Sequence, residues 1–407
     1  MKVALIGAGV QGQVLCTMLV ESPDVDEVRV ADKRFELAKR LADYLKSDKV
    51  SVHSVDASKI DELLKVTEGV DVVVNATVPM LNLTIMQAAF KSRAHYIDLA
   101  SLYETIDEQL GYSEEWKKAG LTAMMGMGYT PGLTDVLAKY AADRLDRVYE
   151  IRVRMYGDAK SKEPIAFWSP AVAWDDIARS PVVFMDGEFK AVPPFSGVEE
   201  YEFPNLKEVF PDVASNKQTC IYHAHEEPHY MGRFFKDKGL RYADFKVAYA
   251  RWEVDKEIVN MGLASTEPIE VDGVKVIPRN VLIQLSPKPL FIEEYKKKIE
   301  EGVLIDQRRY EVVEVRGEKG GKEVKHTMWF YMTLKKAHER IPGATATSYL
   351  TNVSALVATL MLGRGEIETR GVITGEGLSS EEVRKFLTEI AKRGVPIHER
   401  IETTAFP

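Results

Sequence analysis

Glycine residues near the start of the chain are spaced in a way that could hold phosphate groups. Residues 7–12 read Gly-Ala-Gly-Val-Gln-Gly, which fits the pattern G-x-G-x-x-G. An apolar run at residues 3–6 precedes them, and apolar residues at helical spacing follow. A strand, a glycine turn and a helix in this order form the context in which the pattern binds a dinucleotide. The stretch therefore predicts a site for NAD or NADP.

Each residue of this loop has its own physical task. Gly7 permits the tight turn, Gly9 lets the backbone approach a pyrophosphate, and Gly12 lets the helix pack closely on the strand. The amides at the helix start, including those of Val10 and Gln11, then face the phosphates together with the helix dipole. The alternative is a glycine turn in an ordinary parallel α/β unit.

An acidic residue stands where the adenosine ribose of such a cofactor would lie. Residues 28–32 read as the second strand, and Asp32 ends it 20 residues after Gly12. A carboxylate in this position accepts hydrogen bonds from the ribose hydroxyls, which favours NAD. Lys33 and Arg34 follow directly and could instead contact a 2′-phosphate, so NADP stays open.

Further contacts are expected where later parallel strands end, because ligands of open α/β folds bind at the carboxyl edge of the sheet. Tyr129 and Thr130 enter the last of these turns and are expected to contact the substrate. Asp98 ends another strand at this edge and is a candidate catalytic residue. The remaining expected cofactor contacts are Asp56, Ala57, Asn75, Ala76, Thr77, Pro131 and Gly132.

The densest group of titratable side chains reads Tyr-His-Ala-His-Glu-Glu-Pro-His at residues 222–229. On an extended segment, His223 and His225 point to one face, and histidine is the natural acid or base near neutral pH. We expect His225 to handle a proton and His223 to contact the substrate. Such a segment with carboxylates can also bind zinc. Because no cysteine pair or H-E-x-x-H pattern accompanies it, no metal is expected.

A substrate carboxylate would call for arginine, whose planar guanidinium matches it with paired hydrogen bonds. Arg233 follows the histidine group by four residues and is the first candidate. Arg154 and Arg251 lie on predicted antiparallel strands, where a surface charge is the ordinary interpretation.

The order of the elements indicates an α/β fold with a doubly wound parallel sheet of the Rossmann type over residues 1–145. A single helix is predicted over residues 106–119. Six predicted parallel strands alternate with helices, at residues 3–6, 28–32, 50–55, 70–75, 94–98 and 121–125.

The pattern changes after Asp146. Asp186-Gly187 is a strong hairpin turn, and several segments alternate between apolar and polar residues. We expect residues 146–344 to form an inserted, largely antiparallel α+β domain for substrate binding and dimerisation. Residues 345–407 are expected to be helical, with their first helix packing back on the Rossmann domain.

The composition excludes several classes of partner. The 407 residues carry a net charge of −8 and no sustained basic run, which argues against nucleic acid and anionic membranes. No continuous apolar run is long enough to predict a membrane span. Two distant cysteines, Cys16 and Cys220, predict no disulfide framework. The first strand begins at residue 2 and leaves no room for a signal peptide, so we expect a cytoplasmic protein. The apolar face of the antiparallel sheet predicted after Asp146 favours a homodimer.

These motifs resemble those of the saccharopine dehydrogenase-like family, which includes saccharopine reductases, lysine ε-dehydrogenases and carboxynorspermidine dehydrogenases. Two segments depart from the family pattern, at residues 345–349 and 374–376, and both lie near the expected substrate side. The resemblance is carried by residues 3–12, 75–79, 95–100, 119–122 and 128–133, and more loosely by residues 225–229, 239–242 and 371–373.

The resemblance implies a nicotinamide-dependent enzyme that acts at a C–N bond, by amine oxidation to an imine or by the reverse reduction. The cofactor supplies the hydride chemistry, and the protein must manage a proton on nitrogen. We expect an enzyme like lysine dehydrogenase or saccharopine reductase that acts on an amino acid. The alternatives are a carboxynorspermidine-type imine reductase and a non-catalytic protein that kept the nucleotide-binding fold.

Overall fold

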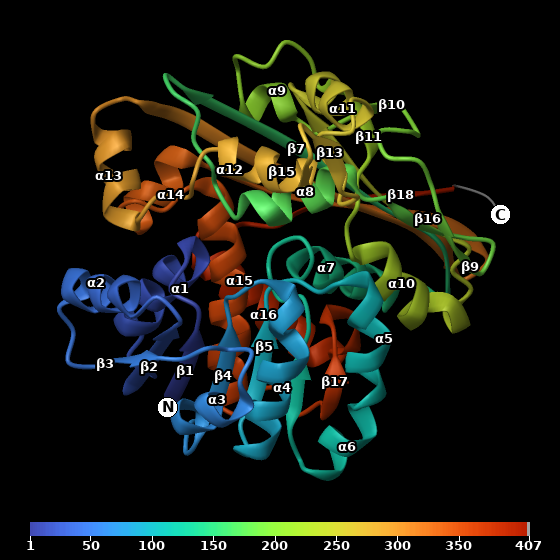
Figure 1. Ribbon diagram of the computed structural model, residues 1–407. Helices are drawn as coiled ribbons and strands as arrows, with labels where there is room; N and C mark the ends of the chain where they lie inside the picture. The colour runs from blue at the N-terminus through green and yellow to red at the C-terminus, as the bar shows by residue number, and fades with distance from the viewer. Residues whose placement is uncertain (405–407) are drawn as a thin grey trace.

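The computed structural model describes residues 1–404, and within them seven strands form an entirely parallel sheet (Figure 1). Their order is β17-β6-β5-β4-β1-β2-β3, so the chain reverses direction across the sheet between β1 and β4, as in doubly wound folds. The strands are β1 (Lys2–Ile6), β2 (Glu27–Asp32), β3 (Val50–Ser54), β4 (Val72–Asn75), β5 (His95–Asp98), β6 (Thr122–Met124) and β17 (Gly371–Ile373).

The predicted Rossmann fold is confirmed, with one strand more than expected. The sequence predicts β1 to β6, whereas β17 reaches the edge of the sheet from the far end of the chain and pairs with β6. The single helix predicted over residues 106–119 is wrong, because the chain forms two helices that meet at Tyr112. The helices here are α1 (Val10–Glu21), α2 (Phe35–Leu45), α3 (Ile60–Thr67), α4 (Asn82–Lys91), α5 (Tyr103–Gly111), α6 (Ser113–Lys118) and α7 (Leu133–Ala142).

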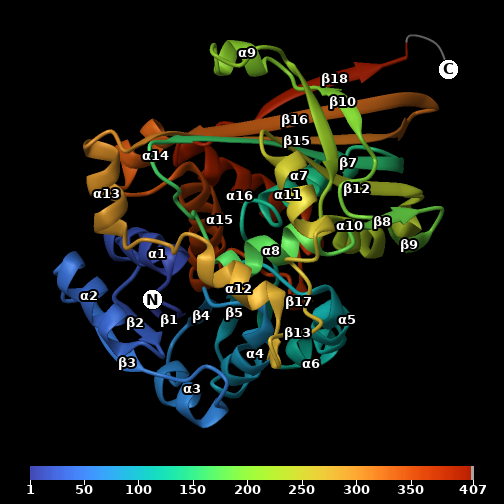
Figure 2. The same cartoon turned by 45° about the horizontal axis from the view of Figure 1, so that its top comes forward.

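A second sheet of nine strands within residues 1–404 lies above the first in Figures 1 and 2. Its pairs are antiparallel except β12 with β7, which are parallel. The main path is β10 (Glu199–Glu202), β11 (Lys217–Tyr222), β12 (Tyr242–Tyr249), β7 (Arg147–Ser161), β15 (Leu304–Lys319), β16 (Lys322–Thr333) and β18 (His398–Thr403), and β8 (Val182–Met185) and β9 (Glu188–Ala191) branch from β12.

Two hairpins of this sheet turn through residues with positive φ, at the predicted turn Asp186-Gly187 and at Gly320-Gly321. Asp186 and Gly187 have φ of 55° and 85°, and Gly320 and Gly321 have φ of 57° and 76°. Two such residues in succession match the right-handed twist of the flanking strands. The turns thereby fix the register of β8 with β9 and of β15 with β16.

The two faces of the mixed sheet bury different side chains. Along β15, Val313 and Val315 belong to the large core shared with the parallel sheet, whereas Tyr310 and Val312 pack on the outer face. The outer face is covered by residues 199–213, which include α9 (Leu206–Val209). Side chains at odd positions of β15 therefore look toward the Rossmann-type layer.

Helix α15 (Ala346–Gly363) lies between the two layers (Figure 1). It packs against α1, β4 and β5 on one side and against β15 and β16 on the other. Within residues 1–404 it is the one helix that is long and apolar enough to cross a membrane, which the sequence analysis does not anticipate. Because 94% of it is buried in the fold, packing accounts for its apolar character.

The remaining elements connect or cover the two layers. Helices α8 and α12 lie in front of the space between them in Figure 2. These elements are α8 (Pro170–Ala178), α10 (Glu227–Phe235), α11 (Trp252–Asn260), α12 (Pro278–Leu285), α13 (Ile292–Glu300), α14 (Leu334–Arg340), α16 (Ser380–Lys392), the hairpin β13 (Ile269–Val271) with β14 (Val274–Val276), and the short turn η3 (Gly375–Gly377).

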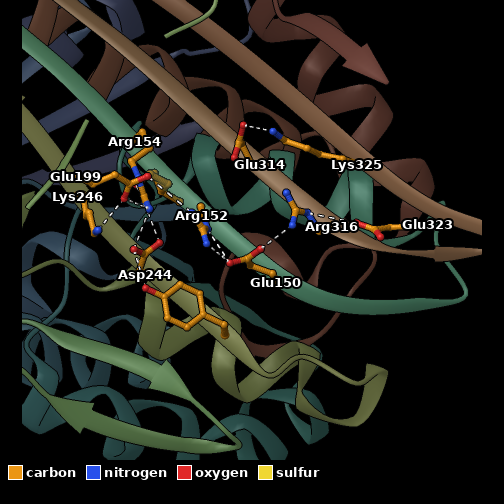
Figure 3. A network of polar contacts seen from close by, with 12 residues as sticks. Glu150, Arg152, Arg154, Glu199, Asp244, Lys246, Glu314, Arg316, Glu323 and Lys325 are labelled. Atoms are coloured by element: carbon orange, nitrogen blue, oxygen red, sulfur yellow. Dashed lines mark hydrogen bonds and ion pairs between the residues drawn. The ribbon is translucent and has the colours of Figure 1, made fainter. Parts of the chain in front are cut away.

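A buried ion-pair network crosses the outer side of the mixed sheet (Figure 3). Arg154 on β7 donates two hydrogen bonds to Asp244 on β12, of 2.7 and 2.9 Å. Glu199 accepts from Arg154 at 3.0 Å and from Lys246 at 2.7 Å. The interpretation of Arg154 as a surface charge is wrong, since 1% of its side chain is exposed. Arg251, in contrast, is exposed.

Candidate active site

The three glycines of the N-terminal loop differ in the space around them. A Cβ on Gly7, whose φ is 106°, would lie 2.8 Å from the carbonyl oxygen of Ala76. A Cβ on Gly12 would lie 1.9 Å from the carbonyl oxygen of Gly7, so helix α1 approaches the turn only because no side chain is present. At Gly9 a Cβ would meet no protein atom within 4 Å. This open space beside the start of α1 fits a diphosphate.

The contrast between two glycines gives a direct test of cofactor binding. We expect Gly9→Val to fold and to weaken NADPH and NADH binding by about tenfold or more, because the side chain would fill the diphosphate space. Gly12→Val should instead destabilise the protein by about 3 kcal/mol or more, because the clash is with backbone. Cofactor titration and thermal unfolding of both variants separate the two effects. Unchanged binding by a folded Gly9→Val protein would contradict the assignment.

Asp32 ends β2 and anchors the same loop. Its carboxylate accepts hydrogen bonds from the amide of Ala8 at 2.8 Å and from the amide of Arg34 at 2.8 Å. Lys33 extends to Asp56, 3.0 Å away. Hydrogen bonds from Ser58 and then from Lys33 lower the pKa of Asp56. Asp32 and two cations thus lie together where the ribose is expected.

The end of β4 is fixed by side-chain amides. Asn75 donates to Asn82 at 2.8 Å and accepts from the hydroxyl of Thr77 at 2.6 Å. The amide of Ala76 donates to the carbonyl of Ile6 at 2.8 Å. The predicted contacts 75–77 therefore lie next to the glycine loop, and Ala57 is buried near the end of β3.

Asp98 is fully enclosed at the end of β5. One carboxylate oxygen accepts from the amide of Gly126 at 2.6 Å and the other from Gln109 at 3.1 Å. Burial raises the pKa of Asp98 to about 7. Since both oxygens contact protein groups, the side chain holds the loop that leads to Tyr129 and Thr130, and this geometry favours a positioning role over contact with the substrate.

His225 and Glu227 form a close pair at the start of α10. Nδ1 of His225 lies 2.6 Å from a carboxylate oxygen of Glu227, whose other oxygen accepts from the hydroxyls of Thr130 and Thr134. Burial disfavours the imidazolium, but the carboxylate outweighs it and raises the pKa of His225 to about 10. The same partner lowers the pKa of Glu227 against the effect of its burial. The pair therefore holds its proton on the ring at neutral pH.

His225 is placed to exchange a proton with a bound molecule. The side chain of Glu227 is 0% exposed, whereas 14% of the His225 side chain remains exposed. Because Nδ1 is engaged, Nε2 is the free donor. The ring stacks on Phe245 at 4.3 Å between centroids, and the backbone carbonyl of His225 accepts from Tyr103 at 2.8 Å. These contacts leave the imidazolium with one orientation.

The second histidine of the pattern lies close to the first. The ring centroids of His223 and His225 are 6.3 Å apart, so both rings lie on one side of the extended segment as predicted. Burial and then the positive charge of His225 lower the pKa of His223 to about 3. His223 is therefore neutral, and its Nδ1 is buried without a hydrogen-bond partner among residues 1–404.

Carboxylates that the sequence analysis did not assign surround this pair; Glu226 and Glu311 are buried and Asp176 is half-buried. Glu226 accepts from the amide of Ser101 at 2.9 Å and lies 3.5 Å from His225. Burial raises the pKa of Asp176, on α8, to about 8, and burial also raises that of Glu311, on β15. One signal could have identified Glu311: two-residue alternation places it on the apolar face with Val313.

A further acid pair lies under the turn that carries Gly132. Asp135 accepts from the amide of Gly132 at 2.7 Å, and Glu376 accepts from the hydroxyl of Thr374. Burial and the mutual proximity of the two carboxyls raise the pKa of Asp135. Burial also raises the pKa of Glu376 to about 7. The atypical segment 374–376 is thus part of the wall of the site.

Two residues that were expected to contact the substrate, Arg233 and Tyr129, have other partners in the structure. Arg233 points to Asp107 at 2.6 Å and stacks on Phe189, so the structure does not bring it to the histidine pair. Tyr129 is buried beside Met155, at the base of the loop.

The metal-binding alternative has a geometric basis within residues 1–404, because one ligand atom from each of His225, Glu226 and Glu227 lies within 4.8 Å of the others. Nδ1 of His225 already contacts Glu227 at 2.6 Å.

Comparisons with known proteins agree on one family. The model of the saccharopine dehydrogenase NADP binding domain matches residues 3–124, and that of the saccharopine dehydrogenase C-terminal domain matches residues 128–395. Carboxynorspermidine synthase of Vibrio alginolyticus is 27% identical, over 98% of this chain and 96% of that protein. Carboxyaminopropylagmatine dehydrogenase of Synechocystis sp. is 23% identical, over 98% of this chain and 97% of that protein.

Two solved structures share the whole fold. Apo saccharopine dehydrogenase (L-Glu forming) from Saccharomyces cerevisiae has a TM-score of 0.68 and 17% identity, covering 99% of this chain and all of that one. Homospermidine synthase from Legionella pneumophila, in complex with NAD, has a TM-score of 0.68 and 14% identity, covering 100% and 92%. With both family models matched along the chain, the protein belongs to the saccharopine dehydrogenase family and is an NAD(P)-dependent oxidoreductase that acts on CH–NH groups.

Proposed function

We propose that the protein reduces the imine formed between a primary amine of a polyamine precursor and an amino-acid aldehyde, to give a carboxylated polyamine. The observation that carries this proposal is the excess of buried carboxyl groups around His225. Glu226, Glu227, Asp176 and Glu311 all act on its charge or lie beside it. Because burial raises the pKa of several of these carboxyls, they can become charged when a cation enters, so the site suits a substrate with several ammonium groups better than one with several carboxylates.

The relatives support the same choice. Carboxynorspermidine synthase and carboxyaminopropylagmatine dehydrogenase match nearly the whole chain, and both names denote a carboxylated amine with further basic groups. We therefore prefer the imine-reductase alternative to the lysine dehydrogenase-like and saccharopine reductase-like functions. Arg233, the arginine expected to bind a substrate carboxylate, contacts Asp107 instead.

The chemistry that we assign to the site is the addition of one hydride and one proton across a C=N bond. The bound nicotinamide supplies the hydride. His225 donates a proton from Nε2 to the imine nitrogen, and Glu227 keeps the ring protonated until then. Thr130 and Thr134 fix the carboxylate, and Phe245 fixes the plane of the ring. In the oxidative direction the neutral ring accepts the same proton.

We assign the cofactor to residues 1–145 together with the last part of the chain. The amides of Val10, Gln11 and Gly12 would face the diphosphate, and Asp32 and Lys33 the ribose. Residues 146–344 would bind the substrate, and residues 345–407 would join the two parts through α15. The other assigned cofactor contacts are Gly7, Gly9, Asp56, Ala57, Asn75, Ala76, Thr77, Pro131 and Gly132.

We also propose that the protein works in the cytoplasm as a homodimer. Cys16 and Cys220 are both free and buried, as in proteins of reducing compartments. Light scattering would measure the mass in solution, and a monomer would contradict the second part of the proposal.

The substrate class can be tested in the oxidative direction. Carboxynorspermidine, carboxyaminopropylagmatine, saccharopine and L-lysine are each offered with NAD or NADP, and the absorbance of the reduced nicotinamide is followed. We expect one of the two carboxylated polyamines to exceed saccharopine and lysine in kcat/KM by about 100-fold, because a mismatched charged group in a buried site is strongly rejected. A preference for lysine or saccharopine would overturn the proposal. Cofactor binding without oxidation of any compound would favour a non-catalytic protein.

A further inference from the structure

Glu311 is a buried carboxyl group without a protein partner. It is 0% exposed, and neither of its oxygens has a hydrogen-bond partner among residues 1–404. Burial and then the negative charge of Glu227 raise its pKa well above the ordinary value. A buried charge that serves stability alone is paired and hydrogen-bonded. Arg154 with Asp244, in the same sheet, shows what such a pair looks like here.

The position of Glu311 directs it toward the candidate site. It shares a face of β15 with Val313 and Val315, which look toward the Rossmann-type layer. Helices α7 and α15 pack against β15 from that side. Glu311 pairs with Met155, which pairs with Val247 on β12, and Phe245 two residues earlier on β12 stacks on the ring of His225, so the carboxyl lies on the side of the sheet that holds the proposed proton donor.

Arg309, the cation on the same face of the strand, is occupied elsewhere. Its Nη1 donates to the backbone carbonyl of Arg308 at 2.9 Å, and its guanidinium lies over the ring of Trp168, 5.9 Å from the centroid. The positive charge of Arg309 opposes the rise in the pKa of Glu311, but within residues 1–404 Arg309 forms no hydrogen bond to its carboxyl. The carboxyl therefore lacks the cation that its burial requires.

We propose that Glu311 binds the distal ammonium group of the substrate, the one that does not take part in the C–N bond chemistry. This inference rests on the proposed function and adds the residue that selects a diamine over a monoamine. The carboxyl would lose its proton when the ammonium enters, and the buried ion pair so formed would hold the reacting nitrogen at a fixed distance from His225. Glu311 would thus be a specificity-determining residue.

The experiment compares two substrates on the wild type, on two variants of Glu311 and on a control variant in the same strand. The substrates are carboxynorspermidine and an analogue in which the distal amino group is replaced by hydrogen. Glu311→Gln removes the charge, and Glu311→Asp keeps it. Glu314→Gln is the control, because Glu314 lies on the same strand but is paired with Lys325 at 2.7 Å.

We expect the wild type to prefer carboxynorspermidine over the analogue by about 50-fold in kcat/KM, the range of a hydrogen bond between charged groups. Glu311→Gln should reduce this preference to about threefold or less, mainly through KM, while the affinity for NADPH stays the same. Glu311→Asp should retain part of the preference, and Glu314→Gln all of it. Thermal unfolding checks that each variant is folded, and an amide in place of a neutral acid should leave the midpoint nearly unchanged.

The outcomes separate the two proposals. If the wild type oxidises carboxynorspermidine but does not discriminate, or if Glu311→Gln discriminates as well as the wild type, the role of Glu311 is wrong and the proposed function stands. If the wild type oxidises neither compound, and no other carboxylated polyamine, both are wrong.

Discussion

Replacing Glu227 by glutamine should lower the rate of imine reduction at neutral pH by about 100-fold or more, the usual contribution of a general acid. In the wild type, Glu227 raises the pKa of His225 to about 10 against the opposing effect of burial. Without that carboxylate, only the more distant Glu226 and Asp176 oppose the effect of burial, which is the largest cause at His223, where the pKa falls to about 3. The variant would hold a neutral imidazole at pH 7, which has no proton to give.

The direction in which the rate of reduction changes with pH follows from the protonation state of His225. Reduction requires the protonated ring, so its rate is retained at low pH and lost as the pH rises through the pKa of His225. The loss should occur near pH 10 in the wild type and below neutral pH in Glu227→Gln. The rate of reduction at saturating cofactor, measured from about pH 5 to about pH 11, covers the loss expected in both proteins.

Glu226→Gln is the matched control for this measurement. Glu226 is the neighbouring carboxylate, but it lies 3.5 Å from His225 and accepts its hydrogen bond from Ser101. Its replacement should therefore move the profile less than that of Glu227. If Glu227→Gln retained the wild-type profile, His225 could not be the proton donor that we propose.

Replacing Asp244 by alanine should destabilise the protein by about 3–5 kcal/mol, the cost of leaving a buried charge unpaired. Arg154 donates two hydrogen bonds to this carboxylate, and neither side chain is more than 1% exposed (Figure 3). Its remaining partner, Glu199, is shared with Lys246 and cannot replace the bidentate contact. Calorimetry or denaturant unfolding of the purified variant measures the loss.

A neighbouring ion pair provides the comparison. Arg152 lies on the same strand, but 37% of its side chain is exposed, and it pairs with Glu150. Arg152→Ala should cost about 1 kcal/mol or less, since exposed pairs contribute little. The double replacement Arg154→Met with Asp244→Leu should recover most of the stability, because neither change then leaves an unpaired buried charge and Lys246 keeps its partner Glu199. Equal losses for Asp244→Ala and Arg152→Ala would show that burial does not set the strength of this network.

Most of the Rossmann-type sheet could be predicted because its strands are buried on both faces and its glycine loop permits few other conformations. β4 reads Val-Val-Val-Asn and is buried throughout, as central parallel strands are. β17 has three residues, and nothing in them indicates a partner almost 250 residues earlier in the chain. The break at Tyr112 between α5 and α6, in contrast, is marked in the sequence by Gly111, a poor helix former that ends α5.

The candidate site was predictable where its residues are neighbours in sequence. His223, His225 and the acids that follow occupy one short segment, and their clustering alone suggested proton chemistry. Glu311 comes from β15 and Asp176 from α8, so only the fold places them near His225. Strand alternation predicts on which face of its strand Arg154 lies, but not that another segment covers that face. The expectation of a surface charge is therefore wrong.

Strand β17 completes the parallel sheet, and helix α15 packs on that sheet. Both features affect how the protein folds during its synthesis. The first six strands are synthesised by residue 124, yet the edge strand next to β6 and the apolar helix that packs on the sheet follow more than 200 residues later. A nascent chain would usually complete its N-terminal domain first. Here the N-terminal layer must wait, with an open strand edge and uncovered apolar surface, until residues 346–373 have been synthesised. The nascent chain should therefore depend on chaperones that shield such surfaces. Removal of residues 345–407 should leave a truncated protein that aggregates.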